Sequence, residues 1–168
     1  MASRALIIGI NSYGNAGDLQ ACVADAEAMT TVLSRHKDKK QNFDCVTWLD
    51  QTDAGLPITR GRLRAALTDL FAFNGDALLY FSGHGFLSRT GGLLCTSDAT
   101  EDDWGVPMQD IVNLSIGSQA RQILIVLDCC HAGAIGNPVL PNAQGAATLT
   151  TLRENMTIIA APEQPKAH

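Results

Sequence analysis

The sequence contains no apolar run long enough to cross a membrane, because polar residues interrupt every stretch before the roughly 18 residues that a spanning helix needs. Its start, Met1–Arg4, leads straight into a predicted strand and has no signal-peptide pattern. No segment is basic enough to indicate nucleic-acid binding, and the net charge is −5. These absences predict a protein that has neither a nucleic-acid nor a membrane partner.

The chain also lacks the signature of a disulfide framework. It has five cysteines, an odd number, and none of them belongs to a CxxC pair. That pattern favours reduced thiols and a cytoplasmic location. Apolar residues make up 46% of the 168 positions, which is enough for one domain with a real core and is not typical of a disordered chain. The cysteines are Cys22, Cys45, Cys95, Cys129 and Cys130.

Two apolar segments end in polar, glycine-containing sequences. Residues 123–127 are apolar and mostly β-branched, and DCCHAG follows at 128–133. Residues 77–81 are likewise apolar, and SGHG follows at 82–85. Both apolar runs are typical of strands that are buried on two faces. Since ligands of open parallel sheets bind just outside the carboxyl ends of the strands, the two polar segments are predicted to form one site across neighbouring strand ends.

A cysteine and a histidine at such a site indicate nucleophilic catalysis. A thiolate is the nucleophile, and an adjacent imidazole can take the thiol's proton and later return it to a leaving amine. Successive side chains of an extended chain point to opposite faces, so Cys129 and Cys130 cannot both face His84. Asp128 and Cys130 share a side if the chain is still extended there. This geometry would place a carboxylate beside the nucleophile.

Strands and helices are expected to alternate along the chain. Strands are predicted at 4–10, 45–50, 77–81, 123–127 and 156–161, and helices at 18–35, 60–72 and 107–114. Thr59 is the predicted N-cap of the second helix, and 91–95 is predicted to add a short strand or hairpin. We expect 134–152 to be a long mobile loop. The alternation predicts an α/β fold with a mostly parallel sheet and helices on both faces.

The SGHG and DCCHAG motifs, in this order and each closing an apolar strand, resemble the caspase–metacaspase superfamily of cysteine peptidases. The likeness is strongest to metacaspases and prokaryotic caspase-like proteins, and it spans nearly the whole chain. It implies a caspase-like α/β/α sandwich. It also implies that His84 is the base and Cys130 the nucleophile, and that the backbone N–H groups of Gly85 and Cys130 form the oxyanion hole.

A third segment, LQACVADA at 19–26, resembles the metacaspase pattern L-x-G-C-x-x-D-A, with Ala21 in the glycine place. By this resemblance, Asp25 and Asp128 line an acidic S1 pocket and favour Arg or Lys as the P1 residue of the substrate. Caspases proper use basic groups to bind aspartate instead, and no arginine stands in the matching places. The alternatives for Asp25 are an exposed helix residue without a role and a local cap.

No metal or other cofactor is predicted. Cys130, His131 and His84 could bind zinc if they converged, but a closed site would consume the nucleophile. His131 is expected to orient the turn after Cys130. Many metacaspases depend on calcium, and the acidic cluster at 101–103 is either a calcium contact or a solvated loop.

The resemblance further implies that a small-subunit region, a helix and a sixth strand, is missing after the last predicted strand. The chain is therefore expected to be truncated or processed, and a naturally minimal domain is the third option. One hypothesis for activation is cleavage of the 134–152 loop, and the candidate self-cleavage sites are Arg153 at the end of the loop and Lys166 near the terminus. The predicted substrate is an unstructured polypeptide segment. Two alternatives stay open: a CHAT-type effector peptidase controlled by a sensor partner, and an inactive caspase-like scaffold.

Overall fold

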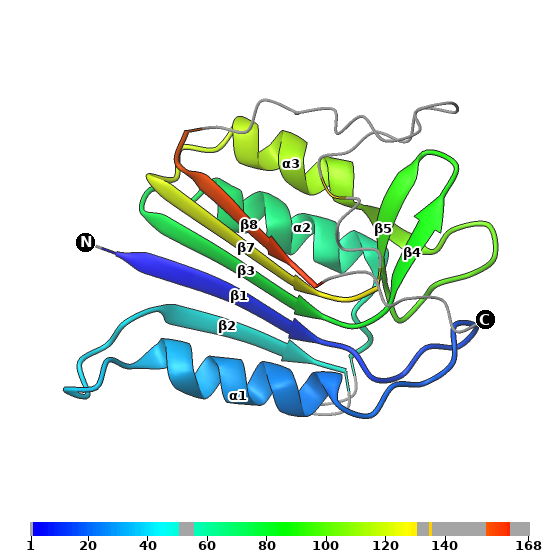
Figure 1. Cartoon of the computed structure of the whole chain (residues 1–168), viewed down its shortest axis with the longest axis horizontal. Helices are drawn as coiled ribbons and strands as arrows, with labels where there is room; N and C mark the ends of the chain where they lie inside the picture. The colour runs from blue at the N-terminus through cyan, green and yellow to red at the C-terminus, as the bar shows by residue number, and fades with distance from the viewer. Residues whose placement is uncertain (1, 51–55, 131–134, 136–153, 162–168) are drawn as a thin grey trace.

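A computed structural model describes residues 2–50, 56–130, 135 and 154–161 (Figure 1). Two sheets and three helices make up this part of the chain. In order, the elements are β1 (Ser3–Gly9), α1 (Cys22–Ser34), β2 (Asp44–Leu49), α2 (Arg60–Phe71), β3 (Asp76–Ser82), β4 (Gly85–Ser88), β5 (Gly91–Cys95), β6 (Gly105–Pro107), α3 (Met108–Ile116), β7 (Gln122–Asp128) and β8 (Met156–Ala160).

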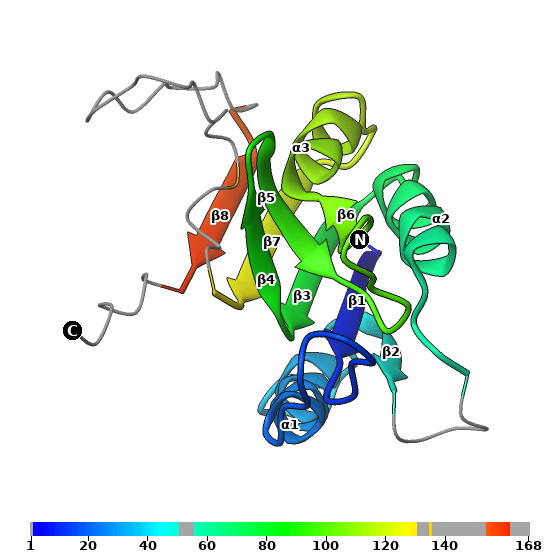
Figure 2. The same cartoon turned by 90° about the vertical axis from the view of Figure 1, so that its right-hand side faces the viewer.

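The larger sheet has five parallel strands in the order β2-β1-β3-β7-β8. The mostly parallel sheet predicted from the sequence is therefore confirmed. Because all five strands run the same way, their carboxyl ends meet along one edge, which faces the viewer in Figure 2. β3 and β7 are neighbours in the middle of the sheet, so the segments that follow them leave the sheet side by side.

Helices cover both faces of this sheet, as predicted (Figure 2). α2 and α3 pack on one face over the larger hydrophobic core, which includes Leu79 and Phe81 of β3. α1 packs on the other face over a smaller core, which includes Leu78 and Tyr80. The alternation of these four residues follows directly from the period of a strand and produces the runs of apolar residues in the sequence.

The predicted extra strand at 91–95 is β5, which forms an antiparallel hairpin with β4 and pairs on its other side with β6. β6 was not predicted from the sequence, because a three-residue strand is too short to show a hydrophobic period. β4 starts at Gly85, so the hairpin grows directly out of the SGHG motif. This small sheet lies at the carboxyl edge of the large one (Figure 1).

The second and third helices are close to their predicted positions. Thr59 caps α2 as predicted, since its hydroxyl accepts a hydrogen bond of 3.3 Å from the backbone N–H of Arg62. α3 starts after Pro107 and ends at Ile116, two residues later than predicted. The apolar positions expected to face inward in these two helices are buried: Leu63, Leu67, Leu70, Met108, Ile111 and Val112.

The predicted start of the first helix, at residue 18, is wrong by four positions. α1 begins at Cys22, where the side-chain oxygen of Asn11 accepts hydrogen bonds from the N–H groups of Cys22 (2.9 Å) and Val23 (3.3 Å). Leu19, assigned to the helix's buried stripe, instead packs against the larger core on the other face. A cap supplied from eleven residues upstream leaves no local signal at the helix start.

Asn11→Ala is expected to lower the free energy of unfolding by about 1–2 kcal/mol, because two N–H groups at the start of α1 lose their acceptor. Urea unfolding followed by circular dichroism measures this loss. Gln20→Ala is the control, since that side chain is exposed, and it should change the free energy by less than about 0.5 kcal/mol. Equal losses in the two variants would show that Asn11 does not cap the helix.

Candidate active site

The two polar motifs lie against each other at the carboxyl edge of the sheet. Ser82, the last residue of β3, is in register with Asp128, the last residue of β7. The N–H of Gly83 points at the carbonyl of Asp128 at 3.4 Å, so the chains stay adjacent one residue beyond the strands. The juxtaposition of the histidine and cysteine segments across neighbouring strand ends is therefore confirmed.

The two adjacent cysteines have opposite environments. Cys129 is 6% exposed and belongs to the larger core, whereas Cys130 is exposed. Burial raises the pKa of the Cys129 thiol to about 12, so this thiol is protonated and unreactive near neutral pH. Burial also raises the pKa of Cys95 to about 11. Of the two candidates, Cys130 alone combines exposure with a position at the strand ends.

Gly85 packs so tightly on the cysteine segment that no side chain fits there. A Cβ atom at this position would lie 1.9 Å from the carbonyl oxygen of Cys130 and 3.2 Å from Sγ of Cys129. The absence of a side chain therefore lets the backbone of the SGHG motif touch the backbone of Cys130. Two backbones this close can present N–H groups to one oxygen atom, which an oxyanion hole requires.

The ring of His84 is held by a backbone carbonyl. Its Nε2 lies 2.8 Å from the carbonyl oxygen of Gly17. Because a carbonyl can only accept, Nε2 carries the hydrogen in this bond, and in the neutral imidazole Nδ1 is then the nitrogen with the lone pair that a general base needs. The sequence pattern could not identify this carbonyl, since every residue has one.

Tyr13 is a second partner of His84 that the sequence analysis missed. The backbone N–H of His84 donates a hydrogen bond of 2.8 Å to the Tyr13 hydroxyl, and the centroids of the two rings are 4.7 Å apart. In the sequence, Tyr13 stands in an ordinary turn segment. A large aromatic residue inside a polar turn was the one feature of the sequence that could have indicated a buried contact at this position.

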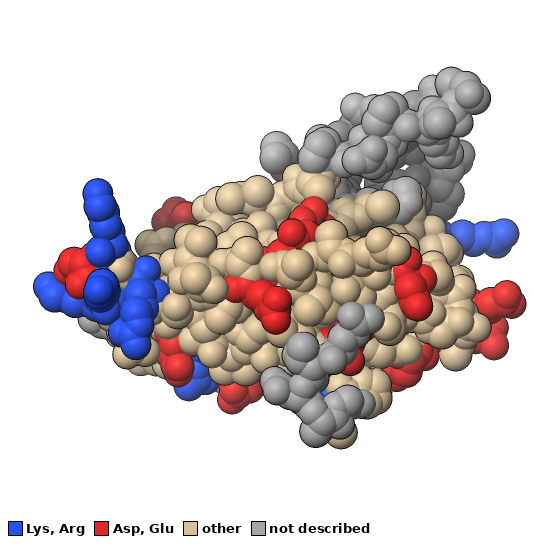
Figure 3. All heavy atoms as spheres, turned by 90° about the horizontal axis from the view of Figure 1, so that it is seen from below, with Lys and Arg blue, Asp and Glu red and all other residues tan. Residues whose placement is uncertain are grey.

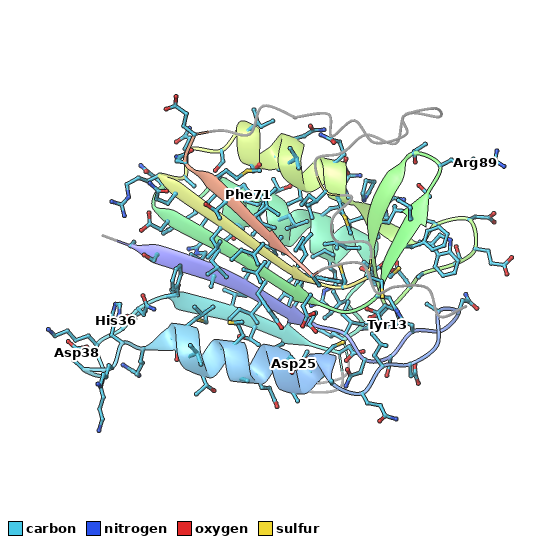
Figure 4. The ribbon with its side chains drawn as sticks, viewed as in Figure 1. Tyr13, Asp25, His36, Asp38, Phe71 and Arg89 are labelled. Atoms are coloured by element: carbon cyan, nitrogen blue, oxygen red, sulfur yellow. The ribbon has the colours of Figure 1, made fainter. Side chains whose placement is uncertain are left out.

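The two carboxylates assigned to the S1 pocket lie toward the same region. Asp25 lies in the first turn of α1, near the carboxyl ends of the strands (Figure 4). Asp128 follows Leu124 and Val126 on the face that α1 covers. Burial raises the pKa of Tyr80 to about 12, and the charges of Asp128 and Asp25 add to the rise. Both carboxylates are exposed.

The acidic cluster at 101–103 is partly engaged in local contacts. Asp103 pairs with Arg60 and also accepts a hydrogen bond from the N–H of Gly105. Glu101 and Asp102 are exposed. Within 2–50, 56–130, 135 and 154–161, no group of three or more His, Cys, Asp or Glu side chains is arranged to hold a metal ion.

Several predicted positions lie outside the described residues. They are His131, the 134–152 loop apart from residue 135, Arg153 and Lys166. The roles predicted for them stay predictions. A separate finding concerns membranes: in the described part of the chain, every helix is too short or too polar to span a bilayer.

Charge is unevenly distributed on the face that α1 covers. Lys and Arg gather at the end where α1 turns into β2, and Asp and Glu are spread over the rest of this face (Figure 3). The basic residues of that turn are Arg35, Lys37, Lys39 and Lys40. Since this turn lies at the amino edge of the sheet, the positive charge is at the opposite end from the candidate site (Figure 4).

Comparison with known proteins links this arrangement to one family. The profile of the caspase domain matches residues 2–166. Metacaspase-7 of Arabidopsis thaliana is 33% identical over 156 residues, which cover 80% of this chain and 36% of that protein. Metacaspase-6 of the same plant is 30% identical over 151 residues, which cover 80% of this chain and 39% of that protein.

A fungal relative matches a shorter segment. Metacaspase-1 of Mycosarcoma maydis is 39% identical over 85 residues, which cover 49% of this chain and 21% of that protein. This chain therefore spans less than two fifths of the length of these curated relatives.

Proposed function

Because this chain belongs to the caspase–metacaspase superfamily of cysteine peptidases, we propose that it is an endopeptidase with Cys130 as nucleophile and His84 as base. The observation that carries the proposal is the contact between the two motifs. Cys130 is exposed, and its backbone packs on Gly85. Gly85 directly follows His84, whose Nε2 is hydrogen-bonded to the carbonyl of Gly17. A thiol, a free imidazole nitrogen and converging backbone amides are the parts that acyl transfer needs.

In the proposed reaction the Cys130 thiol gives its proton to Nδ1 of His84, and the thiolate attacks the carbonyl carbon of the scissile bond. The N–H groups of Gly85 and Cys130 donate hydrogen bonds to the oxyanion that forms. His84 then returns the proton to the leaving amine, the C–N bond breaks, and a thioester remains. Water that gives a proton to His84 hydrolyses the thioester, releases the new carboxyl end and restores the thiol.

The proposed substrate is an unstructured polypeptide with Arg or Lys at P1. Asp25 and Asp128 support this preference, because both are exposed carboxylates on the α1 side of the strand ends. A guanidinium or ammonium group placed between them would gain charge-assisted hydrogen bonds. An aspartate at P1 would be repelled.

A scan of fluorogenic peptides that differ at P1 tests the preference. Arginyl and lysyl peptides should be cleaved, and an aspartyl peptide should not. Asp128→Asn and Asp25→Asn should each lower kcat/KM for the arginyl peptide by about 10- to 100-fold, the range for one hydrogen bond to a charged group. The expected loss is greater at low salt, because exposed charges are screened as the ionic strength rises.

Glu27→Gln is the matched control for the two aspartate substitutions, because Glu27 is an exposed carboxylate two residues after Asp25 in α1. It should leave kcat/KM within about twofold. Comparable turnover of the aspartyl peptide would overturn the P1 assignment. Turnover only with an added sensor protein would favour a CHAT-type effector peptidase, and an inactive scaffold would show none in any condition.

The proposal includes a C-terminal small-subunit segment or a regulatory partner. β8 supports this part, because it lies at the end of the sheet and, among the described strands, β7 alone pairs with it. Self-cleavage after Arg153 or Lys166 stays a prediction, and a Cys130→Ala chain that is still cut when expressed alone would contradict it. A cytoplasmic location also stays a prediction.

A further inference from the structure

We infer that Tyr13 is a positioning residue for His84, and that it fixes the tautomer and orientation in which the imidazole acts as base. The inference rests on the proposed function, because it assigns Tyr13 a role through the catalytic histidine. Tyr13 lies on the turn between β1 and α1, at the same edge of the sheet as the candidate site (Figure 4).

Tyr13 touches His84 at two points. Its hydroxyl accepts the backbone N–H of His84 at 2.8 Å, which holds the main chain of the SGHG motif. Its ring lies against the imidazole, with centroids 4.7 Å apart and planes tilted by 58°. The side chain is 4% exposed, so water does not compete for either contact.

The glycine before His84 makes these contacts feasible. A Cβ atom at position 83 would lie 2.3 Å from the Tyr13 hydroxyl, so any larger residue would displace the tyrosine or the histidine loop. Gly83 and Tyr13 are 70 positions apart in the chain, yet the backbone of Gly83 packs directly against the Tyr13 hydroxyl. The first glycine of the SGHG motif is thus explained by the tyrosine rather than by the chemistry of the reaction.

The turn that carries Tyr13 is itself fixed. The N–H of Tyr13 donates to a carboxylate oxygen of Asp18 at 2.9 Å, and the N–H groups of Asn11 and Ser12 donate to Asp50 at 2.9 and 2.5 Å. The carbonyl of Gly17, next to Asp18, accepts from Nε2 of His84. One turn therefore supplies both the tyrosine that holds the His84 backbone and the carbonyl that orients its ring.

These contacts predict what removal of the hydroxyl would do. Burial raises the pKa of Tyr13, so the hydroxyl is neutral near neutral pH and accepts the His84 N–H. Without it, the N–H of His84 loses its acceptor, and the ring is no longer held at the angle that aims Nε2 at Gly17. The second tautomer, with the hydrogen on Nδ1, then becomes populated and cannot accept the thiol proton.

Tyr13→Phe tests the inference with two readouts. As a single substitution, Tyr13→Phe should lower kcat for an arginyl peptide about tenfold, because the base is misplaced. KM should change less than about twofold, because the substrate contacts are kept. In a Cys130→Ala background, nitrogen-15 spectra of the imidazoles should show the Nε2–H tautomer of His84 alone, and a mixture of tautomers once Tyr13 is phenylalanine. The His84 signals are identified by their loss in His84→Ala.

Two further variants make the test decisive. Tyr80→Phe removes the hydroxyl of the chain's other tyrosine, on the far face of the sheet, and should leave the His84 tautomer unchanged. Asp18→Asn weakens the anchor of Tyr13 at an exposed residue, so the fold tolerates it, and it should give a smaller change in the same direction as Tyr13→Phe.

The outcomes separate the inference from the proposed function. A wild-type chain without turnover contradicts the proposed function, but the tautomer of His84 still tests the contact with Tyr13. An unchanged tautomer in both Tyr13→Phe and Asp18→Asn overturns the inference. A lowered kcat without any change of tautomer also overturns it, because Tyr13 would then have a structural role only.

Discussion

Alanine at position 130 is expected to lower kcat/KM for an arginyl peptide by on the order of 10⁴-fold or more, to the background of the assay. The reason is that the reaction loses the atom that forms the thioester. The side chain is exposed, so its removal leaves no cavity in the core and the fold should be retained. Steady-state kinetics with the fluorogenic peptide and circular dichroism on the same sample measure both effects.

Cys129→Ala is the matched control for that substitution. It removes the same thiol group one residue earlier, but from the core, where burial keeps the thiol protonated. Turnover should stay within about threefold, and the free energy of unfolding should fall by about 1 kcal/mol because a buried atom is lost. If Cys129→Ala abolished turnover and Cys130→Ala did not, the nucleophile would be Cys129, and the assignment of Cys130 would be wrong.

Gly85→Ala is expected to lower kcat by about 10²- to 10³-fold, the cost of losing one oxyanion donor. The added Cβ would lie 1.9 Å from the Cys130 carbonyl oxygen, a backbone atom that cannot swing aside. The two segments must therefore separate, and their N–H groups would no longer point at one oxygen. KM should change much less than kcat, because the oxyanion exists only after the thiolate has attacked.

Gly61→Ala controls for the general effect of adding a methyl group. Gly61 lies in α2, and a Cβ atom there would meet nothing within 4 Å. Turnover should be unchanged and the free energy of unfolding should rise by about 0.5–1 kcal/mol, because alanine is the better helix former. A Gly85→Ala chain with normal kcat would mean that this glycine is needed neither for packing nor for the oxyanion.

Much of the fold could be predicted because the apolar patterns are long. β3 is buried on both faces and β7 is buried on one face and half-buried on the other, so their sequences are nearly continuous apolar runs that end where the polar motifs begin. The opposite environments of Cys129 and Cys130 continue the alternation of β7, although the strand itself ends at Asp128. The joining of the two motifs followed from the rule that parallel strands present their carboxyl ends at one edge.

What could not be predicted depends on contacts between distant residues. The start of α1 is set by the side chain of Asn11, and the orientation of His84 by the Gly17 carbonyl and the Tyr13 hydroxyl. Neither a backbone carbonyl nor a buried hydroxyl leaves a pattern in the sequence, because its partner is chosen by the fold. The prediction that Leu19 lies in the helix was wrong for the same reason. Its backbone N–H donates a hydrogen bond to the carbonyl of Asn11, so the chain at this position is not helical.

The assignment of the S1 carboxylates came from family resemblance and not from spacing. Asp25 and Asp128 stand 103 positions apart, and the sequence alone gives no reason to pair them. Both are exposed and lie on the side of the sheet that α1 covers. Their binding of a basic P1 side chain is the part that the peptide scan decides.

The most direct test of the central claim is to find which atom reacts with a substrate-like inhibitor. An acyloxymethyl ketone with arginine at P1 should form one adduct, and peptide mapping by mass spectrometry should place it on Cys130. The adduct should form in Cys129→Ala and be absent in Cys130→Ala. It should also be absent when the inhibitor carries aspartate instead of arginine at P1. An adduct on Cys129, or labelling by the aspartyl inhibitor in preference to the arginyl one, would contradict the account.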